Sequence, residues 1–200
     1  MNTKSVLLSF VPWVAFSLLV QDGANSVGFA ALLGAVLAIW LIVRGRASGL
    51  KVIDAAGVVT FVALACAAFA GGDVLRDNVA YYGRGAATLV LALVMLASVP
   101  VLPFTEQYAR ESVPRQYWTS PVFRSVNRRI SGVWGLAVLA MAIGTLAAGY
   151  LASDGKESWS ANLVLNWVVT IVAVIVAIRY TRRAAARARA ARNLDSRERR

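Results

Sequence analysis

The chain has 200 residues, of which 58% are hydrophobic and 16% are charged, and its formal net charge is +11. Soluble domains carry charge on about a quarter of their residues, so this composition excludes an ordinary soluble fold and indicates a polytopic membrane protein. Histidine is absent and Cys66 is the one cysteine, which excludes an intrachain disulfide and removes the commonest general base. Because Cys66 lies in an apolar run, we expect its thiol to be buried.

Six apolar segments separated by charges and turn residues predict an all-α bundle of six transmembrane helices. They cover residues 5–20, 27–43, 52–70, 86–102, 132–152 and 161–178. The first is short and contains Pro12, which neighbouring helices can accommodate inside a bundle. The sequence therefore predicts a transmembrane bundle over residues 1–178 and a basic cytoplasmic tail over 179–200, which is rich in Ala and Arg and should continue the last helix.

The basic residues predict an orientation. If both termini lie in the cytoplasm, 18 of the 21 basic residues lie on the inner side, and only Arg76, Arg84 and Lys156 lie outside. This bias favours six spans over five or seven in a multi-pass membrane protein with both termini in the cytoplasm. Four arginines of the tail are expected to bind anionic lipid headgroups at about 1 kcal/mol each: Arg179, Arg182, Arg183 and Arg187. They lack base-reading neighbours, so nucleic acid is not expected as a partner.

Small residues recur at four-residue spacing in two spans, where they let helix backbones approach closely and leave a homodimer open. They are Ala30, Gly34 and Ala38 in the second span, and Ala140, Gly144 and Ala148 in the fifth. The polar loop between the third and fourth spans is expected to be bounded by glycine turns. These glycines are Gly71, Gly72, Gly83 and Gly85.

Polar residues inside the spans are few. Asn162, Asn166 and Thr170 form one stripe along the last span, which should face the bundle interior and either hold the helix by hydrogen bonds or line a pore. Asp54 lies just inside the third span. We expect it to pair with Lys51 or Arg128, with a proton-relay role as the alternative.

The long polar stretch over residues 103–131 predicts an interfacial segment of two helical pieces on the membrane surface. Pro103 and Pro114 bracket the first piece, with Thr105 as its N-cap. The second begins at Ser120 and Pro121 and runs into the bilayer. Four-residue spacing brings Glu106 to Arg110 and Gln107 to Glu111. The candidate polar site consists of Glu106, Gln107, Arg110, Glu111, Asn127 and Arg128; the alternative is that the segment is only a charged linker.

The stretch PFTEQYARES, a following tryptophan and then PVFRSVNRRISGVWG resemble bacterial membrane proteins of the intracellular septation protein A group. In that group an aromatic residue, an Asn and a Trp mark entry into a late transmembrane helix, and Phe123, Asn127 and Trp134 match these places. The resemblance implies an inner-membrane protein connected with the cell envelope and no established reaction. This chain differs in having six predicted spans instead of about five, and in its long basic tail.

Three classes of function follow. The first is a non-catalytic protein that binds lipid or protein partners through the polar cytoplasmic-side surface, with no cofactor or metal. The second is a small-solute or ion transporter or channel, as a dimer. The third is an enzyme acting on a lipid headgroup, with Glu106 or Glu111 as base and Arg110 or Arg128 as phosphate clamp.

Overall fold

The computed structural model describes residues 3–45 and 49–198, with side chains over 7–45 and 49–187. Its main helices are α1 (Thr3–Leu19), α2 (Ala24–Arg44), α3 (Val52–Ala70), α4 (Asp73–Val101), α5 (Phe104–Ala109), α6 (Pro121–Ser153), α7 (Trp159–Asn162) and α8 (Val169–Glu198). A 3-10 turn, η2 (Arg115–Tyr117), precedes α6, and a π-helical segment, η3 (Leu163–Val168), joins α7 to α8. No strand occurs in these ranges, so the predicted all-α class is confirmed.

Five helices are long and apolar enough to cross a membrane, which makes the chain a multi-pass membrane protein. They are α2, α3, α4, α6 and the continuous run from Trp159 to Arg187. The first predicted span corresponds to α1, which has 17 residues. This is shorter than the roughly 20 residues that usually cross the hydrocarbon core, so the sixth span is not confirmed.

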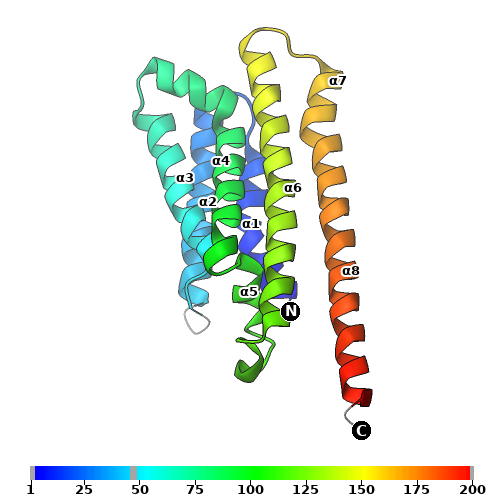
Figure 1. Cartoon of the computed structure of the whole chain (residues 1–200). Helices are drawn as coiled ribbons and strands as arrows, with labels where there is room; N and C mark the ends of the chain where they lie inside the picture. The colour runs from blue at the N-terminus through cyan, green and yellow to red at the C-terminus, as the bar shows by residue number, and fades with distance from the viewer. Residues whose placement is uncertain (1–2, 46–48, 199–200) are drawn as a thin grey trace.

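The long helices lie side by side and run up and down the bundle, with α8 at one edge against α6 (Figure 1). The start of α1, the end of α2, helix α5 and the end of α8 all lie at one end of the bundle (Figure 1). We call this the α5 end. The connections after α1, α3 and α6 form the opposite end (Figure 1).

Aromatic rings from α1 and α3 pack together against α2. The Phe61 ring centroid lies 4.8 Å from that of Trp13 and 5.1 Å from that of Phe16. Gly34 of α2 makes room for Phe61, since a Cβ there would lie 2.9 Å from the ring. Ala30 and Ala38 are buried beside it, so the small-residue stripe of the second span is a packing surface, as predicted.

Two of the glycines expected in a polar loop are helical residues in α4. Gly83 and Gly85 are both buried there, because a Cβ on Gly83 would meet Val27 and one on Gly85 would meet Leu146. The prediction that Gly83 and Gly85 form a turn is wrong, because they allow close packing of helices. Gly71 and Gly72 do lie in the connection between α3 and α4. Helix α4 consequently starts well before the predicted span at residues 86–102.

Helix α6 begins as predicted, with Ser120 at the N-cap position and Pro121 as the first helical residue. The Ser120 side chain makes no capping hydrogen bond. Of the predicted small-residue stripe on this helix, Gly144 is buried but Ala140 is exposed. The helix packs along its length on α4 and, on another side, on α8.

The run from Trp159 to Arg187, which includes most of α8, is the most exposed of the spanning segments. Only 6% of the residues in its most apolar stretch are buried. It is held to α6 by a hydrogen bond from Trp134 Nε1 to Thr181 Oγ1 of 3.0 Å. Asn166 donates through Nδ2 to Asn162 Oδ1 at 2.7 Å, but Asn162 is exposed. The predicted inward-facing stripe is therefore wrong at Asn162, and only Asn166 and Thr170 are half-buried.

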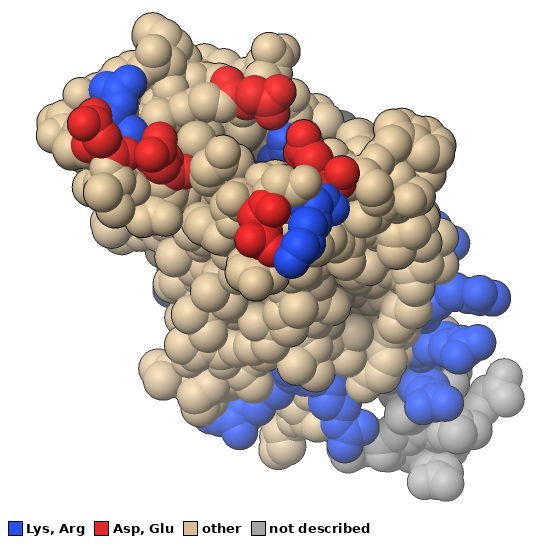
Figure 2. Space-filling model, turned by 90° about the horizontal axis from the view of Figure 1, so that it is seen from above, with Lys and Arg blue, Asp and Glu red and all other residues tan. Residues whose placement is uncertain are grey.

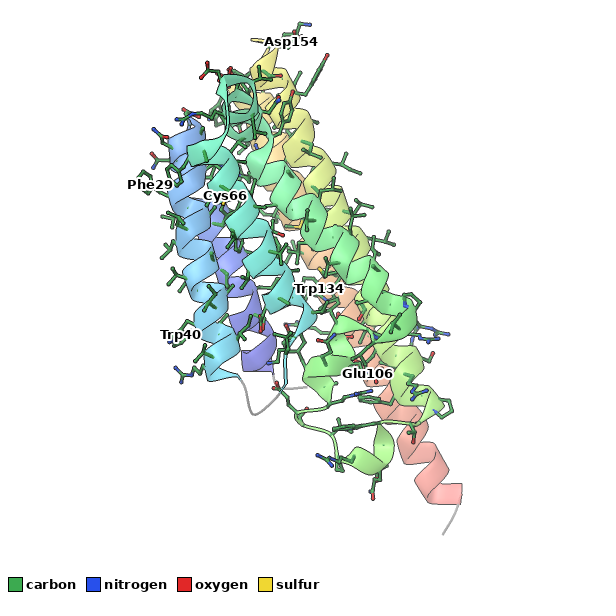
Figure 3. All side chains as sticks on the ribbon, turned by 90° about the vertical axis from the view of Figure 1, so that its left-hand side faces the viewer. Phe29, Trp40, Cys66, Glu106, Trp134 and Asp154 are labelled. Carbon is green, nitrogen blue, oxygen red and sulfur yellow. The ribbon has the colours of Figure 1, made fainter. Side chains whose placement is uncertain are left out.

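Cys66 is exposed on α3, contrary to the buried thiol that we expected. Figure 3 labels it on the outer side of the helix bundle. An apolar run in a membrane helix needs no protein neighbour on every side, because lipid chains are as apolar as a protein core.

Candidate polar site at the α5 end

Helix α5 is tucked into the bundle, with five of its six residues buried. Phe104 and Tyr108 are four residues apart and both fully enclosed, and the Phe104 ring makes an edge contact with Phe10 of α1 at 6.4 Å between centroids. We expected this segment to lie on the membrane surface, but α5 is instead packed inside one end of the bundle. The polar residues of α5 owe their positions to this aromatic face.

Thr105 anchors α5 to α6 instead of capping its own helix. The helix begins after Pro103 at the N-cap position, and Thr105 Oγ1 donates to the Asn127 carbonyl at 3.0 Å. The Thr105 backbone N–H donates to Ser131 Oγ at 3.2 Å. Asn127 itself donates through Nδ2 to the Phe123 carbonyl at 2.8 Å, so its amide N–H is engaged within α6.

Glu106 and Arg110 form the predicted pair one helical turn apart. Glu106 Oε1 accepts from Arg110 Nη2 at 2.6 Å and from Nε at 3.2 Å. The Glu106 side chain is 3% exposed and that of Arg110 is 32% exposed, so the carboxylate relies on this guanidinium for charge compensation. The Arg110 guanidinium also lies 5.0 Å from the centroid of the Trp118 ring.

Gln107 and Glu111 do not meet, because α5 ends at Ala109 and the helical spacing is lost. Both reach across to the start of α3 instead. Gln107 Oε1 accepts from the Val52 backbone N–H at 3.0 Å, which satisfies one free donor at that helix end. Glu111 pairs with Lys51 Nζ at 2.8 Å. These contacts fix the start of α3 to the polar segment.

Asp54 is buried just inside α3, and its Oδ1 has no hydrogen-bond partner among the described residues. The expected partner Arg128 is elsewhere, donating from Nη2 to the Pro100 carbonyl at 3.0 Å. The Lys51 ion pair goes to Glu111, and its ammonium lies 4.7 Å from the centroid of the Tyr108 ring. The charge of Lys51 and the Ser9 side chain compensate Asp54, whereas the expected ion pair with Arg128 is not formed.

The Tyr108 hydroxyl is another buried oxygen atom without a hydrogen-bond partner in the described part of the chain, as are Asp54 Oδ1 and Asn166 Oδ1. Burial raises the pKa of the Tyr108 phenol above its ordinary value, and the nearby negative charges of Asp54 and Glu111 act in the same direction. Buried Ser9 of α1 lies beside both Asp54 and Tyr108. We call Ser9, Lys51, Asp54, Tyr108 and Glu111 the buried polar cluster. Sequence reasoning missed Ser9 and Tyr108, since neither stands out by spacing.

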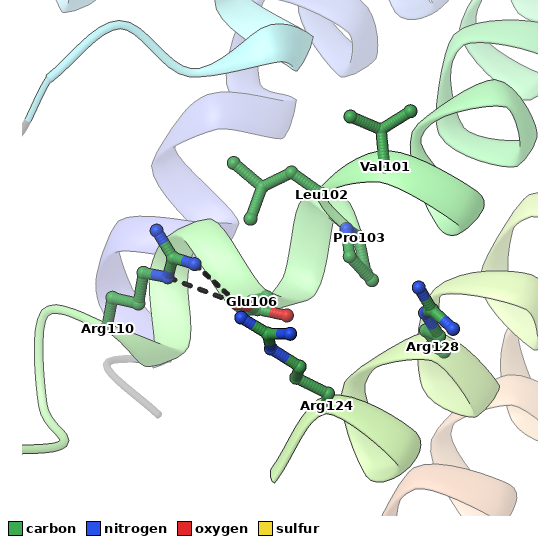
Figure 4. A pocket seen from close by; sticks show the side chains of 7 residues that line it. All are labelled: Val101, Leu102, Pro103, Glu106, Arg110, Arg124 and Arg128. Atoms are coloured by element: carbon green, nitrogen blue, oxygen red, sulfur yellow. Dashed lines mark hydrogen bonds and ion pairs between the residues drawn. The ribbon is translucent and has the colours of Figure 1, made fainter. Parts of the chain in front are cut away.

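A small pocket of about 110 Å³ opens on the other side of α5 (Figure 4). Its lining consists of Val101, Leu102, Pro103, Glu106, Arg110, Arg124 and Arg128. We call it the arginine pocket, because three of its seven lining residues are arginines. Arg124 was not among the residues predicted for the site; its four-residue spacing from Arg128 was the available signal.

The predicted lipid-binding arginines of the tail lie on α8 beyond the apolar part of the helix. Arg179, Arg182, Arg183 and Arg187 are all exposed. The helix itself continues through Glu198, as expected for an Ala- and Arg-rich sequence. The side chains of Lys4, Arg46, Arg189, Arg192, Arg197, Arg199 and Arg200, which also count toward the predicted basic side, lie outside the described residues.

The fold defines a helical, multi-pass membrane protein with a polar, arginine-rich site at one end of the bundle. No family model, curated protein or solved structure matches the chain.

Proposed function

We propose that this chain is a non-catalytic integral protein of a bacterial cytoplasmic membrane that binds anionic lipid headgroups at its α5 end. The supporting observation is an asymmetry of charge between the two ends. Five of the ten acidic residues lie at or near the opposite end, where Figure 2 shows acidic side chains gathered on the surface. They are Asp22, Asp73, Asp77, Asp154 and Glu157, and they accompany Arg76, Arg84 and Lys156. Most other basic residues belong to the α5 end.

This asymmetry supports an orientation with the α5 end and both termini in the cytoplasm. Arginines close to a membrane surface attract anionic headgroups at about 1 kcal/mol each. The orientation requires an even number of spans, so we propose α1 as the sixth. At 1.5 Å per residue its 17 residues would extend about 26 Å, a little less than the hydrocarbon core.

The resemblance to the septation protein A group supports the same proposal. The residues that carry it lie in α5, just after it and in the first half of α6, where Thr105 and Trp134 join α6 to α5 and α8. We propose that the chain shares with that group a place in the cell envelope.

Lipid selectivity tests the proposal. The full chain is incorporated into nanodiscs that contain equal amounts of phosphatidylglycerol and phosphatidylcholine, released into neutral detergent and analysed by native mass spectrometry. We expect phosphatidylglycerol to be retained in excess, because only the anionic headgroup gains from the arginines. Equal retention of the two lipids would contradict the proposed function.

The buried polar cluster favours transport as a second candidate function. Burying an ionisable residue inside a membrane bundle costs free energy, so such residues commonly mark functional sites. Asp54 is buried, with one oxygen unpartnered among the described residues. Ion flux into liposomes measures this directly. Transport predicts a flux that Asp54→Asn abolishes, whereas an absence of flux from the parent protein removes the candidate.

A further inference from the structure

We propose that the arginine pocket is a specific site for the phosphate group of an anionic phospholipid, with Arg124 and Arg128 as its principal ligands. This inference rests on the proposed lipid-binding function and gives it a location. The tail arginines of α8 are exposed along a helix, whereas the pocket converges three guanidinium groups on one small volume. Convergence of donors is what separates a site from a charged surface.

The residues that line the pocket carry an excess positive charge that no acidic residue of the pocket compensates. Three guanidinium groups and one carboxylate leave two positive charges in excess. Glu106 forms its ion pair with Arg110, and neither Arg124 nor Arg128 forms an ion pair within the described residues. Guanidinium groups present planar forks of N–H donors that match phosphate oxygens, so a phosphate suits this set better than a simple halide.

The position of Arg124 on α6 supports an anion in the pocket. It lies four residues after the N-cap Ser120, and the first turn of the helix contains no acidic residue. Positive side chains near a helix N-terminus oppose the helix dipole, whereas an anion there is favoured by it. A bound phosphate would compensate both the dipole and the two arginines.

Several contacts hold the pocket in shape before any ligand arrives. Arg128 donates to the Pro100 carbonyl at 3.0 Å, which leaves its other N–H groups available. Arg110 is held between the Glu106 carboxylate and the Trp118 ring. Side chains that are already ordered lose less entropy on binding, so this arrangement favours affinity.

The rim of the pocket favours a lipid over a soluble phosphate. Val101, which lines the pocket, is 86% exposed at the end of α4. It lies where the apolar part of α4 ends, at the level expected for headgroups. An exposed apolar rim beside a cationic pocket fits a ligand that carries both a phosphate and acyl chains.

The test compares two double variants of the full chain in neutral detergent, with short-chain phosphatidylglycerol as the probe. The pocket variant carries Arg124→Gln and Arg128→Gln, and the control carries Arg182→Gln and Arg183→Gln on exposed tail residues. A charge-assisted hydrogen bond is worth about tenfold in affinity, so we expect the pocket variant to bind the lipid at least roughly tenfold more weakly. The control should stay within about twofold. Binding is followed by the lipid-induced rise in melting temperature and by native mass spectrometry.

The single variant Arg124→Gln keeps the test valid if the double pocket variant fails to fold. Arg124 is exposed and its side chain makes no hydrogen bond or ion pair within the described residues, so replacing it should not disturb the fold. It should melt like the parent and still lose affinity. Loss in the tail control with full binding in both pocket variants would overturn this inference and leave the proposed function standing. An equal response of the parent to phosphatidylcholine would overturn both. Equal protection by inorganic phosphate at the same concentration would overturn the lipid assignment.

Discussion

Replacing Gly144 by Ala tests how α8 is attached to the bundle. Gly144 faces the π-helical segment η3, and a Cβ at this position would lie 2.5 Å from the Leu165 carbonyl oxygen. That oxygen belongs to the backbone, so it can move away only if the helix moves. We therefore expect Gly144→Ala to push the η3 and α8 region away from α6 and to destabilise the protein.

The size of the effect follows from two opposing terms. Ala is favoured over Gly in a helix by about 1 kcal/mol. Overpacking a close contact costs about 1–3 kcal/mol, and a backbone oxygen places this site toward the upper part of that range. The net destabilisation is about 1–2 kcal/mol, which lowers the melting temperature by roughly 2–8 °C for a chain of this size.

Gly132→Ala is the matched control on the same helix. A Cβ at Gly132 would meet nothing within 4 Å, so this variant keeps the helix-propensity gain without the clash. Thermal unfolding in detergent, followed by tryptophan fluorescence, should show Gly132→Ala melting at or above the parent and Gly144→Ala below it. Equal melting temperatures for the two variants would refute the packing of η3 against Gly144.

The remaining predictions concern the buried polar cluster and Cys66. Lys51→Gln and Glu111→Gln should each destabilise the protein but couple in a double-mutant cycle by about 1–3 kcal/mol, since the pair is nearly buried; additive effects would exclude the ion pair. Because burial raises the pKa of Tyr108, its folded form resists ionisation, so stability should be intact at neutral pH and fall as pH rises above about 10, and Tyr108→Phe should remove part of that loss. Identical pH profiles would contradict this. Cys66 should react with a small apolar maleimide in the folded protein; protection until unfolding would mean that it is buried.

The sequence predicted the long helices well because hydropathy reports directly on them. The third predicted span, 52–70, coincides with α3 (Val52–Ala70), since Lys51 and Gly71 punctuate its two ends. The start of α6 at Pro121 was predicted equally well, because serine is favoured at the N-cap position and proline at the first helical position. Pairing of Glu106 with Arg110 followed from local helix geometry.

Contacts between distant elements were not predictable in the same way. Helical spacing states which residues share a face but not which element lies opposite, so the partners of Gln107 and Glu111 at the start of α3 were missed. Polarity was read as exposure, although Glu106 and Thr105 are buried with their partners. Gly83 was read as a turn because a glycine that fits against Val27 looks the same in sequence as one that bends the chain.

The orientation of the bundle is the claim on which the proposed function and the arginine pocket both depend. It can be measured by single-cysteine accessibility in intact spheroplasts, on a Cys66→Ser background, with a membrane-impermeant maleimide. Gln116→Cys at the α5 end and Glu157→Cys at the opposite end leave every basic residue in place. We expect Glu157→Cys to be labelled at once and Gln116→Cys only after permeabilisation. Labelling of Gln116→Cys in intact cells, with Glu157→Cys protected, would contradict it.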